Sequence, residues 1–362
     1  MNIESTDSKW SALTDYIEAH QCDWPLQPDP NDKQWGIHLE DIPPHNRLLG
    51  PVFERGKTCG LIISKGETVC RWGDTARADM TFSVTKTCLA LVAGIAYDQG
   101  LITDIDQAIA QRLPGIGFDD EHNRQISWRQ MLQFTSEWQG ECFGVPDLVD
   151  HNRHIHLQPG TSTQRKGELR TLQTPGTHWE YNDIRINQFS LALLHLFKKS
   201  LPDVLNEFIM QPLGASNTWS WHGYENSWGG IDGQKLQSVP GGGHWGGGMV
   251  INAEDQALLA HMMLYLGKRD NTPDSAQLVS RDWIEMMLQP CAIAPFYGFF
   301  TWLNHDNKIS KKSPASSFFC LGIGGQLLLH DPESQLVAIY RWLDSEHISA
   351  ILDLTYEILE KN

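Results

Sequence analysis

Ser83 and Lys86 are the two residues whose spacing suggests chemistry most directly, because they form a Ser-x-x-Lys pattern. They stand at the start of an apolar run that continues to Tyr97 and ends at Gly100, a residue type suited to a left-handed helix end. Residues three apart share one face of a helix, so the hydroxyl and the ammonium would be neighbours. Burial at the positive end of the helix dipole would lower the pKa of the lysine, and the neutral amine could accept the serine proton. The pattern predicts a nucleophilic serine.

The same four residues also allow a purely structural interpretation. Ser83 could cap the helix, and Lys86 could be a solvated residue of its first turn. About one Ser-x-x-Lys is expected by chance in a chain of this length. The pattern alone leaves both interpretations open, and the residues further along the chain must decide between them.

Composition limits the classes of protein to consider. The chain of 362 residues is 41% hydrophobic and 20% charged, as in ordinary globular proteins, and no stretch approaches a membrane-spanning run. A net charge of −16 argues against nucleic acid or an anionic membrane as partner. Seven scattered cysteines and a polar N-terminus without a signal-peptide pattern favour the cytoplasm. We expect a small-molecule substrate, with no metal and no cofactor; the sequence does not indicate the oligomeric state.

The elements that must position Ser83 follow from hydrophobic patterns and turn signals. The patterns predict strands at both ends of the chain and mostly helices between them, which indicates an α+β fold: an α/β/α sandwich whose antiparallel sheet comes from both chain ends. Residues 1–80 and 240–362 would form the sheet-containing lobe, and 81–239 an inserted, mostly helical lobe, with the active site at the interface. The predicted elements are helices near 8–20, 128–132, 186–197 and 347–360, a helix from Asn252 to Leu266, a hairpin over 60–73, and strands over 325–330 and 336–342.

Several segments, taken in order, resemble the serine β-lactamase-like hydrolases, a family of class C β-lactamases, D-Ala-D-Ala carboxypeptidases, esterases and amidases. Thr81–Thr87 resembles the active-site helix of that family, and Ile126–Ser136 resembles its "T-x-x-x-L-L-x-H-T-S-G" segment, with Glu137 in place of the glycine. Glu180–Asp183 lies where the family has its Tyr-x-Asn element, and the glycines before Asn252 are similar to its "G-G-G-x-x-S-x-x-D" region. The resemblance covers roughly residues 55–345 and implies a β-lactamase/transpeptidase-like fold.

The resemblance implies Ser83 as the nucleophile, Lys86 as its activating partner, and Tyr181 as the phenol that relays a proton to the leaving group and helps activate water. The structural alternative for Tyr181 is a packed aromatic residue. Asp183 replaces the family's asparagine. It could pair with Lys86 and keep it protonated, or it could cap the helix that follows.

The third motif of the family, Lys-Thr-Gly or His-x-Gly, is missing in its usual form. The segment from Gly322 to Gln326 takes its place without a cationic side chain, which argues against efficient β-lactam hydrolysis and for the esterase and 6-aminohexanoate-dimer hydrolase branch. Gly325 is predicted to donate a backbone N–H to the oxyanion together with Ser83, with Gly324, Gln326 and Asp183 as further oxyanion or substrate contacts. The alternative for these glycines is a bulge on an edge strand.

Other signals have more ordinary explanations. His151, His154 and His156, near Asp150, could ligate a metal, but a polar loop without fixed spacing favours a solvated surface segment. Most of the fourteen tryptophans are expected in the core, and His244 with Trp245 could border the cleft. The leading hypothesis is a serine hydrolase that forms an acyl-enzyme; the alternatives are a non-catalytic penicillin-binding-like protein and, more distantly, a metal-dependent hydrolase.

Overall fold

The computed structural model describes residues 8–28, 41–155 and 164–360, and its largest sheet joins two distant parts of the chain. The strands of this sheet are β1 (Cys59–Ser64), β2 (Glu67–Trp72), β10 (Trp302–Leu303), β11 (Phe318–Gly322), β12 (Gln326–Asp331) and β13 (Leu336–Arg341). Their order is β10-β11-β12-β13-β1-β2, and every neighbouring pair is antiparallel. All six residues of the inner strand β13 are buried, so both faces of the sheet are covered.

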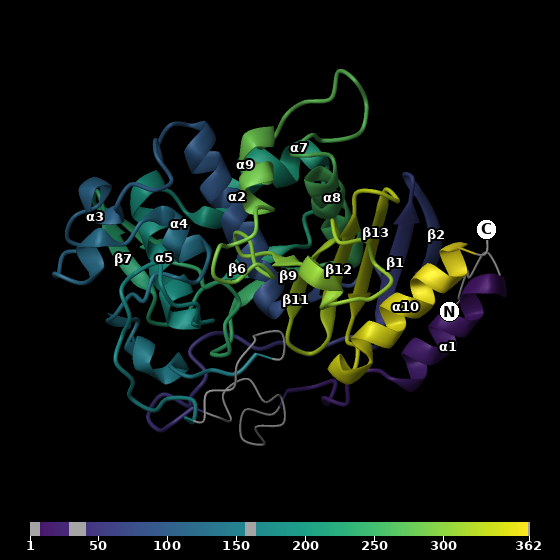
Figure 1. The fold of residues 1–362 in the computed structure, drawn as a ribbon, viewed down its shortest axis with the longest axis horizontal. Helices are drawn as coiled ribbons and strands as arrows, with labels where there is room; N and C mark the ends of the chain where they lie inside the picture. Colours follow the sequence, from purple (N-terminus) through teal and green to yellow (C-terminus); the bar gives the residue numbers. More distant parts are fainter. Residues whose placement is uncertain (1–7, 29–40, 156–163, 361–362) are drawn as a thin grey trace.

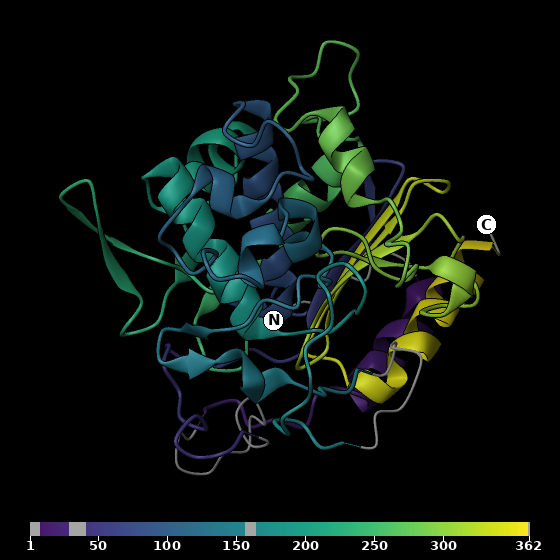
Figure 2. The ribbon, with the colours of Figure 1, turned by 60° about the vertical axis from the view of Figure 1, so that its left-hand side comes forward.

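Helices lie on both faces of this sheet (Figures 1 and 2). Helices α1 (Ser11–Ala19) and α10 (Ile348–Glu360) lie side by side on one face, where Ala338 and Tyr340 of β13 share a core with Ile351. The alternate residues Val337 and Ile339 pack with α8 (Ala253–Leu264) on the opposite face. This alternation of side chains across β13 produces the three layers, and the predicted α+β sandwich is confirmed.

The remaining helices belong mainly to the segment between strands β3 (Asp79–Met80) and β6 (Ser220–His222). They are α2 (Thr85–Asp98), α3 (Ile109–Arg112), α4 (Trp128–Leu132), α5 (Asp183–Phe197), α6 (Leu201–Leu205), α7 (Gln211–Leu213) and, later in the chain, α9 (Arg281–Met287). Helix α2 is the central one, because residues 85–96 are all buried and it packs on α5, α6 and α9. The predicted division into two lobes stays a prediction.

Short strands complete the fold. A three-stranded sheet has the order β3 (Asp79–Met80), β9 (Gly248–Ile251), β6 (Ser220–His222). Two hairpins are formed by β4 (Glu141–Cys142) with β5 (Val145–Pro146), and by β7 (Trp228–Ile231) with β8 (Gln234–Gln237). Strand β9 is important for the site, because the glycine-rich turn of residues 241–248 leads into it.

The sequence predicted most of these elements. The hairpin, the final two strands and the helices at both ends of the chain lie where they were expected, and Asn252 caps α8 as predicted. Helix α2 ends as predicted too, with Gly100 at a φ of 69° directly after it. All seven cysteines are buried and free. Among the described residues, no helix has the length and apolar character needed to span a membrane.

Candidate active site

Ser83 lies in a short 3-10 turn, Phe82–Val84, that leads directly into α2. Phe82 is buried with a φ of 47°, a left-handed conformation that costs a bulky residue about 1–3 kcal/mol. The glycine-rich turn packs against this strained residue: a Cβ on Gly242 would lie 1.8 Å from the carbonyl oxygen of Phe82. The close approach of the two backbones fixes the turn that carries the Ser83 hydroxyl.

The Lys86 ammonium points at Ser83 and lies among three oxygen atoms. It donates to the Ser83 hydroxyl at 2.9 Å and to the Gly241 carbonyl at 3.2 Å, and its nitrogen lies 2.7 Å from Asp183 Oδ1. The side chain is 2% exposed. Three acceptors around one buried nitrogen are the environment of a charged ammonium.

The expectation of a neutral lysine is wrong for this arrangement. Burial alone would lower the pKa of Lys86, but the Asp183 carboxylate in direct contact outweighs burial and raises it above its ordinary value. The helix dipole is a weaker effect than a carboxylate in direct contact. Lys86 is therefore a cation that orients and polarises the Ser83 hydroxyl.

Asp183 is free to hold Lys86 because its neighbour caps the helix. Asn182 accepts hydrogen bonds from the backbone N–H groups of Ile184 and Arg185, at 3.1 and 3.2 Å, and is the N-cap of α5. Of the two roles left open for Asp183, the structure supports the pairing with Lys86. Burial opposes ionisation of Asp183, but nearby Lys86 and Arg153 hold its pKa well below the ordinary value.

Tyr181 is buried beside both cations. Its ring centroid lies 5.0 Å from Lys86 Nζ and 5.1 Å from the guanidinium carbon of Arg153. The ring stacks on Phe134 at 4.5 Å and on Trp302 at 6.0 Å between centroids. The structure thus brings together Ser83, Lys86 and Tyr181, and it adds Arg153, which the sequence did not single out.

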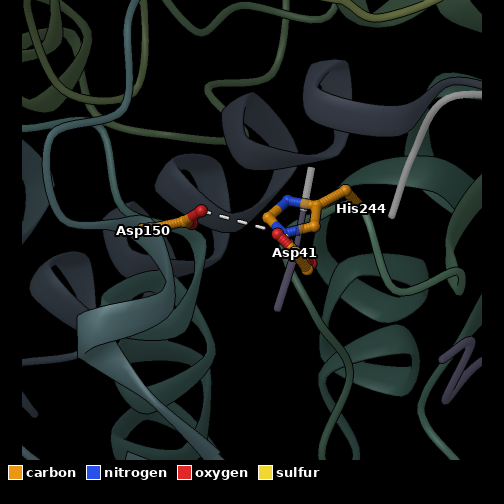
Figure 3. A group of neighbouring side chains, drawn as sticks. All are labelled: Asp41, Asp150 and His244. Carbon is orange, nitrogen blue, oxygen red and sulfur yellow. Dashed lines mark ion pairs between the residues drawn. The ribbon is translucent and has the colours of Figure 1, made fainter. Parts of the chain in front are cut away.

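A second group of charged side chains surrounds Asp183 on the side away from Lys86. His244 Nδ1 lies 3.1 Å from Asp183 Oδ2, and His244 Nε2 lies 2.9 Å from Asp41 Oδ2. Asp150 approaches the same imidazole at 3.7 Å, as Figure 3 shows, and accepts the backbone N–H of Asp183 at 2.7 Å. His244 was expected to border the cleft; it is buried beside Asp183, the partner of Lys86, and its place at a cleft stays a prediction.

This group resembles a metal site in composition but already contains a cation. Asp41, Asp150 and His244 offer ligand atoms within 4.8 Å of one another. The Lys166 ammonium lies 2.5 Å from Asp41 Oδ1 and 3.2 Å from Asp150 Oδ1, so it takes the position between the two carboxylates. Because a lysine supplies the charge, we interpret the group as an ion-pair cluster and assign no metal to it.

The expected solvated histidine loop is different in the structure. His151 is buried and its Nε2 lies 2.8 Å from Asp147 Oδ2, while His154 is exposed; His156 lies outside the described residues. The expectation of a solvated segment is wrong for His151. The same stretch contributes Arg153, so a segment that reads as polar loop contains buried charges that complete the site.

The end of β11 brings backbone close to the nucleophile. A Cβ on Gly322 would lie 3.4 Å from the Ser83 amide nitrogen and 2.3 Å from the Thr81 carbonyl oxygen. Gly325, the predicted oxyanion donor, packs against Leu343, where an added Cβ would meet the carbonyl oxygen at 1.9 Å. Its assignment stays a prediction, and Gly322 is the glycine that the structure places against Ser83.

The other two residues predicted in this segment have structural contacts. Gly324 lies against Trp342 and Trp24. Gln326 is buried, accepts a hydrogen bond from Arg341 Nε at 3.2 Å and donates to the Gly324 carbonyl at 3.2 Å. A side chain held in this way shapes the turn after β11.

Glu137, the departure from the family glycine, keeps the backbone conformation of a glycine. Its φ is 50°, and its carboxylate accepts two hydrogen bonds of 2.6 Å from Arg170 and one of 3.0 Å from Arg185. Glu180 pairs with the same two arginines. The ion pairs of this buried network connect residues 164–180 to α5. The sequence alone did not indicate this role of Glu137.

Comparisons with known proteins agree with this fold. The family model described as Beta-lactamase matches residues 62–342. No curated protein matches the chain. A beta-lactamase from Mycobacterium bovis superposes with a TM-score of 0.54 at 18% identity, covering 83% of this chain and 94% of its own.

Two further solved structures share the fold. EstCE1, a hydrolase with promiscuous acyltransferase activity, has a TM-score of 0.59 at 15% identity, covering 85% of this chain and 94% of its own. The octameric penicillin-binding protein homologue from Pyrococcus abyssi has a TM-score of 0.59 at 15% identity, covering 87% of this chain and 74% of its own. The family match spans most of the sequence and includes Ser83, Lys86 and Tyr181, so this chain belongs to the Beta-lactamase family.

Proposed function

We propose that this protein is a serine hydrolase that cleaves an ester or amide through an acyl-enzyme at Ser83. The observation that supports this best is the 2.9 Å hydrogen bond from Lys86 to the Ser83 hydroxyl, with Lys86 itself held by Asp183. A buried lysine fixed on a half-buried serine is a costly arrangement with little structural benefit, and such perturbed groups concentrate at functional sites.

Because Lys86 is charged, the proton acceptor in our proposal is Tyr181 in its phenolate form. The Ser83 hydroxyl loses its proton to the phenolate as its oxygen bonds to the substrate carbonyl carbon. When the tetrahedral intermediate collapses, the bond to the leaving oxygen or nitrogen breaks, and Tyr181 returns the proton to that atom. Water then attacks the acyl group by the same route, and Ser83 recovers its proton.

We further propose that backbone N–H groups stabilise the oxyanion, one from Ser83 and one from the segment of residues 322–325 at the end of β11. The contact between Gly322 and the Ser83 amide supports this placement. Two N–H donors directed at the developing negative charge are worth several kcal/mol, with about 3 kcal/mol for a single donor. No metal or cofactor is part of the proposal.

We infer the substrate class from the lack of a cation on residues 318–326. Residues 318–326 contain no lysine or arginine, so the strand lacks the cation expected for the carboxylate of a β-lactam or a peptide C-terminus. We therefore propose an uncharged ester or amide as substrate. The shared fold with EstCE1 supports an esterase, and the Beta-lactamase family match is compatible with an amidase.

The test is covalent labelling with a fluorophosphonate probe, read by intact mass, beside turnover of p-nitrophenyl esters of graded chain length, nitrocefin and D-amino-acid amides. We expect one probe adduct on Ser83, loss of adduct and turnover in Ser83→Ala, and faster turnover of esters than of nitrocefin. Ser316→Ala, which removes an exposed serine, is the control and should label fully.

The alternatives give different results in the same experiment. A folded protein that neither labels nor turns over any substrate would support the non-catalytic penicillin-binding-like protein and overturn our proposal. Turnover that a chelator abolishes and that survives Ser83→Ala would support a metal-dependent hydrolase instead.

A further inference from the structure

The candidate site lacks a cation where the family has one and has an additional cation elsewhere. The segment from Gly322 to Gln326, which takes the place of the third motif, contains no lysine, arginine or histidine. Arg153 comes from a different segment, after the 3-10 turn Asp147–Asp150, and its guanidinium lies against the Tyr181 ring. We propose that Arg153 is a positioning residue that supplies, at Tyr181, the second positive charge that the β11 strand does not provide. The inference deepens the proposed function and depends on it.

Contacts hold Arg153 in this place. Its Nη1 lies 2.5 Å from Asp183 Oδ2 and 3.2 Å from Asp150 Oδ2, and its guanidinium carbon lies 5.1 Å from the Tyr181 ring centroid. Lys86 binds the other oxygen of Asp183. One carboxylate therefore fixes two cations against one phenol, and neither can move without disturbing the other.

The charges of the whole cluster leave a place for one anion. The carboxylates are Asp41, Asp150 and Asp183; the cations are Lys86, Arg153, Lys166 and, when protonated, His244. Both ring nitrogens of His244 face carboxylate oxygens, at 3.1 and 2.9 Å, so the imidazolium can donate to both. When His244 is protonated, the described side chains of this cluster carry four positive charges and three negative charges. A phenolate at Tyr181 would balance the fourth positive charge.

Within the described part of the chain, the remaining contacts of Tyr181 offer no other charge. Phe134, Trp179 and Trp302 pack on its ring, and the titratable group among its other neighbours is Tyr297, which is buried. Burial raises the pKa of Tyr297 well above its ordinary value, so it stays neutral. In such apolar surroundings the Coulomb attraction between a phenolate and an adjacent cation is stronger than in water.

The test measures the ionisation of Tyr181 directly. The ultraviolet absorbance of the phenolate is titrated in the full-length protein, and the same titration of Tyr181→Phe identifies the contribution of Tyr181. We expect Arg153→Gln to raise the midpoint by at least about one pH unit. Asp150→Asn removes a negative charge 3.2 Å from Arg153 and should lower the phenolate midpoint. Shifts of opposite sign indicate charge, since loss of packing gives no such pattern.

The second measurement is the pH profile of acylation by p-nitrophenyl acetate, a neutral ester. Its rising limb should move with the absorbance midpoint, and Arg153→Lys should restore part of the shift. The control is Arg129→Gln, which removes an arginine 5.6 Å above the Phe299 ring and paired with Asp106, outside the cluster; both midpoints should be unchanged.

Failure of this inference differs from failure of the proposed function. If Arg153→Gln lowers the rate equally at every pH and leaves the phenolate midpoint in place, Arg153 is only a structural residue and the inference is overturned. If the wild-type protein shows no acylation, the proposed function fails, while the absorbance titration still decides what Arg153 does to Tyr181. If Arg153→Gln does not fold, the Asp150→Asn variant decides the question. A phenolate midpoint in Asp150→Asn that is equal to or higher than the wild-type midpoint would overturn the inference.

Discussion

At the scale of single residues, Asp183 has the central position in the site. One of its oxygens contacts Lys86, and the other contacts Arg153 and His244, all within 3.1 Å. A buried carboxylate without such partners would cost several kcal/mol, so the three cations and Asp183 depend on one another. The charge state of Lys86 is therefore set by all the charged groups around Asp183 together.

His244 offers a measurable consequence of this coupling. Burial, Arg153 and the Lys166 ammonium 3.4 Å away oppose its protonation, but Asp150, Asp183 and Asp41 raise its pKa above the ordinary value. A raised pKa in the folded state gives stability that is complete below the unfolded value of about 6.5 and is lost as pH rises through the folded value. We expect His244→Gln to lower the free energy of unfolding by about 2 kcal/mol near pH 6, and by less above the folded pKa.

The measurement is denaturant unfolding at a series of pH values, with His305→Gln as the control. His305 is a half-buried histidine whose side chain is 42% exposed, and its replacement should leave stability within about 0.5 kcal/mol at every pH. A His244→Gln penalty that grows as pH rises would contradict the protonated imidazole.

Single residues also show where sequence reasoning ends. Ser83, Lys86 and Tyr181 could be placed together because spacing and family motifs connect them. The charge of Lys86 could not be predicted from the sequence. It depends on Asn182 being the N-cap of α5, which leaves the Asp183 carboxylate free to pair with Lys86. Asn182 is itself a favoured cap residue, so this signal was present in the sequence and was missed.

At the scale of elements, the decisive contact is between the glycine-rich turn and the turn that carries Ser83. Gly242 has a φ of 76°, and a Cβ there would lie 1.8 Å from the Phe82 carbonyl oxygen. Backbone cannot give way as a flexible side chain does, so the nucleophile turn would have to shift. The dense glycines of this segment are therefore explained by the close approach of two main chains.

We expect Gly242→Ala to destabilise the protein by more than about 1 kcal/mol and to abolish ester turnover. Gly233→Ala is the matched control: Gly233 has a similar φ of 80°, in the turn between β7 and β8, but nothing lies within 4 Å of its added Cβ. Backbone strain alone should cost about 1 kcal/mol there and leave activity intact. Thermal unfolding and p-nitrophenyl acetate turnover measure both effects. Equal loss of activity in the two variants would show that the close contact is unimportant.

Regular elements were easier to predict than the segments between them. Periodicity and caps placed α8, α10 and the last two strands correctly, because their patterns are local. The segment after β5 was expected to be a solvated loop, since it is poor in apolar residues. Its charges are buried through partners far away in sequence, such as Asp147 with Arg185 at 3.5 Å, and no local pattern reveals such partners.

At the scale of the whole molecule, two of the buried ion-pair networks have different consequences. One surrounds Asp183 at the candidate site, and the other joins Glu137 and Glu180 to Arg170 and Arg185. The second network has no contact with Ser83 among those described. Its effect should therefore be on stability.

Glu137 allows this to be tested by acid unfolding. Burial opposes its ionisation, but Arg170 and Arg185 lower its pKa to about 2. A lowered pKa gives stability that is present above the unfolded value of about 4.3 and is lost as pH falls through the folded value. We expect Glu137→Gln to lower the free energy of unfolding by about 3 kcal/mol at pH 7, and by progressively less between about pH 5 and pH 2.

The control for this prediction is Glu285→Gln, which breaks an exposed ion pair with Arg281 at 2.7 Å. Exposed pairs contribute about 0–1 kcal/mol, so its effect should be small throughout. A Glu137→Gln penalty that is constant from pH 7 to pH 2 would mean that packing, and not the charge of Glu137, is responsible.

The cluster around His244 draws on residues 41, 150, 153, 166, 183 and 244, which are spread over about two hundred positions of the chain. Contacts between residues so far apart in sequence form late in folding, because the long chain segments between them must be ordered first. During refolding, helices and hairpins can appear while Lys86 still lacks its complete set of charges. Recovery of ester turnover would then lag behind recovery of secondary structure, and enzyme activity would report the completion of the native state.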